Sequence, residues 1–145
     1  IIFCDIKTNL GDNYAREVKI NELKETSDII SLHTNLNQSS RHIIDKQFID
    51  DCKKSFCLIN TARGECVSNH DLIYGLESDK IIGAGLDVLE NENKDFEGIA
   101  VDQNLDKLKK FENVILTPHI AGWSKESKVK LAQITVNKIK EFLDL

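Results

Sequence analysis

Several residue types and patterns are missing from this 145-residue chain, and each absence excludes something. There is no methionine, so we expect the chain to be a piece of a longer polypeptide that starts upstream of Ile1. No apolar run approaches the ~20 residues that a membrane helix needs, and no charged segment leads into an apolar one at the start, so the sequence predicts neither a membrane anchor nor a signal peptide. The four cysteines form no Cys-x-x-Cys pair and have no metal-like spacing to the four histidines. We therefore expect no metal site, and free thiols in a reducing compartment such as the cytoplasm.

Charge of one sign is not concentrated anywhere along the chain. The net charge is −5, and lysines are interspersed with acidic residues. Without a basic stripe to neutralise phosphates, nucleic acid is not expected as a partner. Hydrophobic residues make up 41% of the chain, which is enough for one domain with a core of its own.

What the chain does contain is an alternation of short apolar runs and longer stretches with helical spacing. This alternation is typical of a parallel sheet with crossover helices. We expect strands at residues 1–5, 18–20, 28–33, 56–60, 81–88 and 114–117. We expect helices at residues 21–27 (capped by Asn21), 45–52, 69–78, 101–110 and 124–145 (with Ser124 and Ser127 as candidate caps). Ligands of open α/β sheets bind at the carboxyl ends of the strands, so residues that follow the strands are the candidates for a site.

The most informative segment is 58–64 (LINTARG), in which an apolar run ends in small residues, an arginine and a glycine. Arg63 at the end of a strand can hold a carboxylate through two parallel hydrogen bonds. His119 follows another apolar run, and a histidine can carry a proton near neutral pH. Glu92 follows a third strand and could orient that imidazole and raise its pKa. An arginine, a carboxylate and an imidazole at three strand ends indicate that a 2-keto acid is polarised and protonated.

Each of these residues also has a simpler interpretation. Arg63 could be a surface arginine in a turn where Gly64 adopts a positive φ. His119 could be an ordinary turn histidine, and Glu92 one acid among several. Their equivalent positions at the ends of three consecutive expected strands favour a shared catalytic site.

Two further strand ends carry residues typical of a cofactor site. Asp5 ends the first expected strand, where an acidic residue can accept hydrogen bonds from the adenosine ribose and repel the 2′-phosphate of NADP; alternatively it is a turn residue. His33 is either a half-buried histidine bonded to backbone or a cofactor contact. His42 and His70 lie in polar stretches and are expected at the surface. The glycine-rich phosphate loop that normally precedes an acidic residue such as Asp5 by about 20 residues is absent.

The sequence resembles the NAD-dependent D-2-hydroxyacid dehydrogenases in four segments that follow one another in the order of that family. They are residues 27–33 (SDIISLH), 59–64 (INTARG), 85–88 (GLDV) followed by Glu92, and 116–122 (LTPHIAG). The resemblance implies an α/β fold, a partial Rossmann-type doubly wound parallel sheet that lacks its first βα unit and ends in a long C-terminal helix. It implies a partial NAD-binding domain at residues 1–122. Residues 123–145 would form a helix that leads back toward a substrate domain outside this chain.

The resemblance also implies roles for individual residues. Arg63 would bind the carboxylate and carbonyl of the substrate, His119 would protonate the carbonyl oxygen as hydride arrives from NADH, and Glu92 would hydrogen-bond to His119. The residues implied in cofactor binding are Asp5, His33, Thr34, Thr61, Ala62, Arg63, Asp87, His119, Ala121 and Gly122. The implied partner is a small 2-hydroxy or 2-keto acid, and the implied assembly is a homodimer or larger.

Within the family, segment 118–122 (PHIAG) looks most like the D-3-phosphoglycerate dehydrogenases. A glyoxylate, hydroxypyruvate or other D-2-hydroxyacid reductase is the alternative of the same class. A non-enzymatic NAD-sensing module, similar to a corepressor, is the alternative of another class. An inactive truncated protein is a third. The presence of Arg63, Glu92 and His119 together favours the enzyme.

Overall fold

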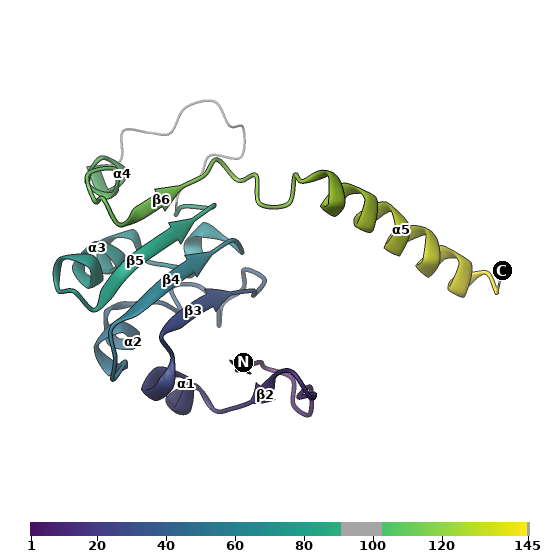
Figure 1. Cartoon of the computed structure of the whole chain (residues 1–145), viewed down its shortest axis with the longest axis horizontal. Coiled ribbons are helices and arrows are strands. Elements are labelled where there is room, and N and C mark those ends of the chain that lie inside the picture. Colours follow the sequence, from purple (N-terminus) through teal and green to yellow (C-terminus); the bar gives the residue numbers. More distant parts are fainter. Residues whose placement is uncertain (91–102, 145) are drawn as a thin grey trace.

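The computed structural model describes residues 1–90 and 103–144, and these form an α/β structure with one long projecting helix (Figure 1). The strands are β1 (Ile2–Phe3), β2 (Arg16–Glu17), β3 (Ile29–Leu32), β4 (Phe56–Asn60), β5 (Ile81–Leu86) and β6 (Val114–Leu116). The helices are α1 (Ile20–Thr26), α2 (Lys46–Asp51), the short 3₁₀ helix η1 (Gly64–Cys66), α3 (Asn69–Glu77), α4 (Gln103–Leu108) and α5 (Lys125–Phe142). Strands and helices alternate as the sequence predicts.

The main sheet has four parallel strands in the order β3-β4-β5-β6. Because all four run in one direction, the segments that follow them meet at a single carboxyl edge. Strands β1 and β2 form a separate parallel pair and are not hydrogen-bonded to β3. The strand predicted at 18–20 is wrong in its bounds: β2 is Arg16–Glu17, and although the Val18 amide still donates to the Phe3 carbonyl, α1 already begins at Ile20.

Side-chain caps fix the starts of three helices. Asp45 accepts a hydrogen bond from the Phe48 amide at the start of α2, and Ser124 accepts one from the Ser127 amide at the start of α5. Ser68 caps α3 in the same way. The predicted cap Asn21 is wrong, because α1 begins at Ile20, one residue earlier, and its N-cap position carries no side-chain cap.

The core lies between one face of the main sheet and the helices that cover it. Its least exposed side chains include Ile49, Phe56, Leu58, Leu72 and Ile81. On the other face, Ile59 and Ile115 stand in register on either side of Gly85 and remain partly exposed. One face of the sheet is therefore packed, and the other presents an open apolar surface.

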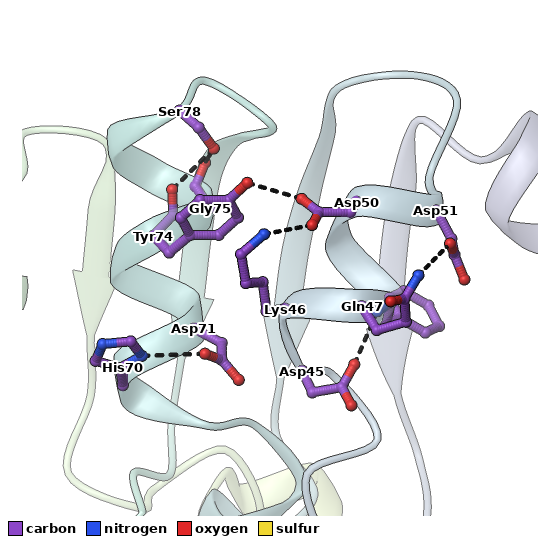
Figure 2. Close-up of polar contacts among 11 residues, drawn as sticks. Asp45, Lys46, Gln47, Asp50, Asp51, His70, Asp71, Tyr74, Gly75 and Ser78 are labelled. Carbon is purple, nitrogen blue, oxygen red and sulfur yellow. Dashed lines mark hydrogen bonds and ion pairs between the residues drawn. The ribbon is translucent and has the colours of Figure 1, made fainter.

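An exposed polar cluster joins α2 to α3 (Figure 2). The Tyr74 hydroxyl donates to Asp50 Oδ1 over 2.8 Å, and the Lys46 ammonium bonds to the same carboxylate while lying 4.1 Å from the centre of the Tyr74 ring. The bond from Lys46 is the main cause that lowers the pKa of Asp50. Because these groups are solvated, their ion pair adds little stability, and the cluster is a surface contact between two helices.

Helix α5 confirms the helix predicted at the C-terminal end and extends away from the rest of the structure (Figure 1). None of its residues is buried, although Val129, Val136 and Ile139 form an apolar stripe along one side. No helix among the described residues is both long and apolar enough to cross a membrane.

Candidate active site

The carboxyl edge of the main sheet gathers most of the predicted site residues. Thr61, Ala62 and Arg63 follow β4, Asp87 follows β5, and residues 117–122 follow β6. Backbone hydrogen bonds join the three segments: the Asp87 amide donates to the Asn60 carbonyl over 2.9 Å, and the His119 amide donates to the Asp87 carbonyl over 2.9 Å. The loops of Arg63 and His119 are thus connected through β5.

Arg63 lies in a tight turn held by Asn60, the last residue of β4. Asn60 Oδ1 accepts from the Ala62 amide over 3.1 Å, and Asn60 Nδ2 donates to the Arg63 carbonyl over 3.0 Å. The Arg63 guanidinium donates to the Ala62 carbonyl over 2.6 Å, and the side chain is exposed at the edge. Sequence reasoning missed Asn60; the available signal was a polar residue at an inward position of an otherwise apolar strand, in line with Phe56 and Leu58.

Position 64 requires glycine because another backbone segment approaches it closely, not because of its own backbone angles. The positive φ at Gly64 that the alternative interpretation of Arg63 assumed is not present. A Cβ built on Gly64 would lie 1.9 Å from the carbonyl oxygen of Leu89, in the segment that follows β5. Only glycine lets the turn after β4 pack against that segment.

Replacing Gly64 by alanine is expected to destabilise the fold by roughly 2 kcal/mol or more, because a backbone segment has to move to admit the methyl group. Gly85→Ala is the matched control, since a Cβ at Gly85 meets no atom within 4 Å. Urea unfolding of the two variants measures the difference. Equal stability of the two variants would contradict the close packing at Gly64.

The Asp87 carboxylate organises the loop after β6. Oδ1 accepts from the Thr117 hydroxyl (2.6 Å) and the Ile120 amide (2.9 Å), and Oδ2 accepts from the Ala121 amide (2.9 Å). Burial raises the pKa of Asp87, but its hydrogen bonds to Thr117 and to the loop backbone outweigh burial and hold the pKa below its ordinary value; the nearby His119 lowers it further. The cofactor contact that the family resemblance implies for Asp87 stays a prediction.

His119 is half-buried and stands at the tip of this loop. Its backbone has φ of 54°, a left-handed conformation that non-glycine residues seldom adopt. Such strain persists only where surrounding bonds hold it, and here the His119 amide bonds to the carbonyls of Asp87 and Thr117. Glu92, the third member of the predicted catalytic set, lies outside the described residues, so its contact with His119 stays a prediction.

A cavity of about 290 Å³ opens on the uncovered face of the sheet beside these loops. Its lining residues are Ile59, Thr61, Gly85, Leu86, Asp87, Ile115, Thr117, Ile120 and Ala121. The predicted cofactor residues Thr61, Asp87 and Ala121 therefore share one hollow. Its largely apolar lining and small size fit a flat ring such as nicotinamide, but not a whole dinucleotide.

The other predicted cofactor residues lie outside this cavity. Asp5 is exposed after β1, and its Oδ1 accepts from the Lys7 amide over 2.8 Å, so it does act as a turn residue. His33 is exposed and its Nε2 lies 2.9 Å from the Ser31 hydroxyl, which contradicts the half-buried, backbone-bonded alternative. Thr34 bonds to the neighbouring Asn35 carbonyl.

A second cluster was missed because its members are far apart in the sequence. His42 is half-buried rather than at the surface, with Nε2 2.5 Å from Glu90 Oε1 and a positive φ of 51°. Glu90 Oε2 also accepts from the Asn69 amide at the start of α3. The cluster anchors the segment after β5 to the helix layer. His70 is exposed, as predicted.

All four cysteines are free thiols, as predicted. Within the described ranges, no group of three or more histidine, cysteine, aspartate or glutamate residues is placed to hold a metal ion.

A parallel sheet with an apolar hollow and polar loops at its carboxyl edge defines a dinucleotide-binding domain of the Rossmann type. Residues 1–121 match the family model described as "D-isomer specific 2-hydroxyacid dehydrogenase, NAD binding domain". The chain belongs to this family, and the resemblance seen in the sequence is confirmed.

Individual relatives agree with this family. The chain is 36% identical over 134 residues to an aromatic 2-oxoacid reductase of Clostridium sporogenes, covering 89% of the chain and 40% of the relative. It is 37% identical over 134 residues to a hydroxypyruvate reductase of Blautia hydrogenotrophica, covering 92% and 39%. Among solved structures, the NAD-complexed form of a D-isomer specific 2-hydroxyacid dehydrogenase from Lactobacillus delbrueckii ssp. bulgaricus superposes with a TM-score of 0.82 at 32% identity, covering 96% and 44%. The chain thus spans about two fifths of the length of these proteins.

Proposed function

We propose that this chain is the NAD-binding part of an oxidoreductase that transfers a hydride between NAD(H) and a D-2-hydroxy acid or its 2-keto acid. The observation that carries the proposal is the joining of the Arg63 and His119 loops through Asn60 and Asp87, beside an apolar hollow. Membership of the family supports the same chemistry.

In the proposed mechanism the bound cofactor supplies the hydride. Arg63, exposed at the sheet edge, binds the substrate carboxylate and turns the carbonyl toward the hollow. His119 holds the proton that its imidazole delivers to the carbonyl oxygen during reduction and takes back during oxidation. Glu92 is proposed to hydrogen-bond to His119 and orient its imidazole. The apolar floor formed by Ile59 and Ile115 would exclude water from a nicotinamide ring held in the hollow.

The cofactor is proposed to bind through two separate regions of the chain. Thr61, Asp87 and Ala121 suit the nicotinamide end because they line the hollow. Asp5 suits the adenosine ribose, because only one of its carboxylate oxygens is used in its turn, and its charge favours NAD over NADP. The described residues contain no glycine-rich loop before a helix to hold the pyrophosphate. We therefore expect residues 1–145 by themselves to bind NADH weakly.

The proposed substrate is an unphosphorylated 2-oxo acid. The relatives cited above are named for aromatic 2-oxo acids and hydroxypyruvate. The D-3-phosphoglycerate hypothesis rests on segment 118–122 alone and is retained as the second candidate. A corepressor-like role is disfavoured by the presence of Arg63 and His119 at one edge.

The domain boundaries are proposed as the sequence predicts them. Residues 1–122 form part of the NAD-binding domain, and residues 123–145 lead toward a substrate domain. The apolar stripe of α5, which no described residue covers, supports a packing partner for that helix. We propose a homodimer or larger assembly and a cytoplasmic location for the whole protein.

A substrate panel tests the function. The complete gene product is mixed with NADH or NADPH and with phenylpyruvate, pyruvate, hydroxypyruvate, glyoxylate or 3-phosphohydroxypyruvate, and oxidation of the cofactor is followed. We expect NADH to be oxidised fastest with an unphosphorylated acid and the product to have the D configuration. Preference for 3-phosphohydroxypyruvate would favour the second candidate, and no oxidation with any acid would refute the enzyme.

A further inference from the structure

Asn60 is a buried polar residue to which the mechanism proposed above assigns no step. It ends β4 with only 1% of its surface exposed, and its register partners Leu32 and Leu86 are buried apolar residues. Burying an amide among such neighbours is costly unless its donor and acceptor are both used. Both are used, and both serve the turn that carries Arg63.

The two side-chain bonds of Asn60 bracket this turn. Oδ1 receives the Ala62 amide and Nδ2 reaches the Arg63 carbonyl, so the backbone on both sides of the Ala62–Arg63 peptide is held by one rigid group. The guanidinium then bonds back to the Ala62 carbonyl, which places the arginine side chain relative to the same turn. The direction in which Arg63 leaves the sheet is therefore set from within the core.

The backbone of Asn60 extends this connection to the other loop. Its carbonyl accepts from the Asp87 amide, and the Asp87 carboxylate and carbonyl hold the loop of His119. A continuous chain of hydrogen bonds runs from Arg63 through Asn60 and Asp87 to His119. A shift at Asn60 displaces the proposed carboxylate-binding group relative to the proposed proton donor.

We propose that Asn60 is a positioning residue that fixes Arg63 against His119. This inference rests on the proposed function, because it assigns Asn60 a purpose in the same reaction. Asparagine fits the requirement because it carries both a donor and an acceptor. Leucine of similar size has neither a donor nor an acceptor, and ionised aspartate has no donor for the Arg63 carbonyl.

The first test is Asn60→Ala in the complete gene product. We expect kcat/KM for the best 2-oxo acid to fall about 10–100-fold, as a misplacement of about 1 Å produces, mainly through a higher KM for the acid and with the KM for NADH little changed. Asn113→Ala is the matched control, because the Asn113 amide also donates to a strand carbonyl, that of Ile82, but at the opposite edge of the sheet. An unchanged KM for the acid in a folded Asn60→Ala variant would overturn the proposal.

Asn60→Asp gives a second, pH-dependent readout that loss of packing does not produce. Protonated aspartate has the shape of asparagine and can donate to the Arg63 carbonyl, whereas the ionised form cannot. The charged groups next to position 60 are Arg63 on the same turn and Asp87 bonded to its backbone. We expect the ratio of variant to wild-type kcat/KM to rise as pH falls, and a ratio independent of pH would count against the proposal. Because this readout compares Asn60→Asp with wild type across pH, it holds even if Asn60→Ala fails to fold.

Amide hydrogen exchange tests the positioning role of Asn60 separately from the proposed reaction. Asn60→Ala, which removes the acceptor of the Ala62 amide, should raise exchange at Ala62 and at Ile120, and Asn113→Ala should not. If wild type reduces no 2-oxo acid but this exchange pattern appears, the proposed reaction is wrong and the coupling of the two loops stands. If wild type is active and Ile120 keeps its protection, the coupling through Asn60 is wrong.

Discussion

Replacement of His119 by asparagine should lower kcat for 2-oxo acid reduction by about 10²–10⁴-fold, the contribution expected of a positioned general acid. Asparagine is the informative choice because it tolerates the left-handed backbone that His119 adopts, so the loop keeps its shape while the titrating group is lost. The KM for NADH should change little. Steady-state kinetics of the complete gene product with its best acid measures the effect.

The matched control for this variant is His70→Asn. His70 lies on α3 with 85% of its side chain exposed and pairs with the neighbouring Asp71, so the His70→Asn variant should have the activity of wild type. If His119→Asn retains wild-type turnover while its loop is folded, the proton comes from another group. The mechanism proposed above would then be wrong at its central step.

The sequence predicts those parts of the fold that leave a local pattern. The apolar run 56–60 became β4 with the same bounds, and Ser124 was recognisable as a cap because a cap acts within three residues of itself. Arg63 could be placed at the sheet edge for the same reason, since the strand that ends before it is continuous and apolar.

Other parts of the site depend on contacts that have no local pattern. The His42–Glu90 pair joins residues 48 positions apart, and the need for glycine at position 64 comes from Leu89, across the space between two strands. Asn60 could be recognised as unusual from its inward position, but not as the holder of Arg63. Packing distances of this kind follow from the register of β4 against β5, which the sequence alone does not fix.

Asp87→Asn is the substitution for which we expect the largest loss of unfolding free energy. The Asp87 carboxylate accepts one hydroxyl and two backbone amides, and the neutral amide of Asp87→Asn would turn a donor toward at least one of them. We expect Asp87→Asn to lose about 2–4 kcal/mol of unfolding free energy at pH 7, because hydrogen bonds to a charged group are strong and a buried donor is left unpaired. Asp71→Asn on α3 is the matched control, and its loss should stay below about 1 kcal/mol, the size of a helix-terminus charge effect.

The difference in unfolding free energy between wild type and Asp87→Asn should also depend on pH. The pKa of Asp87 in the folded protein lies below its ordinary value of about 3.9 in the unfolded chain. Its stabilisation is therefore fully present above the unfolded pKa and disappears as pH falls through the folded pKa, where both states become protonated. Other carboxylates with lowered pKa, such as Asp50 and Asp51, contribute alike to wild type and variant and cancel in the difference. The gap in stability between wild type and Asp87→Asn should thus narrow below about pH 4. Urea titrations from neutral to acid pH measure that gap, and a constant gap would mean that the loop of His119 is not held by an ionised Asp87.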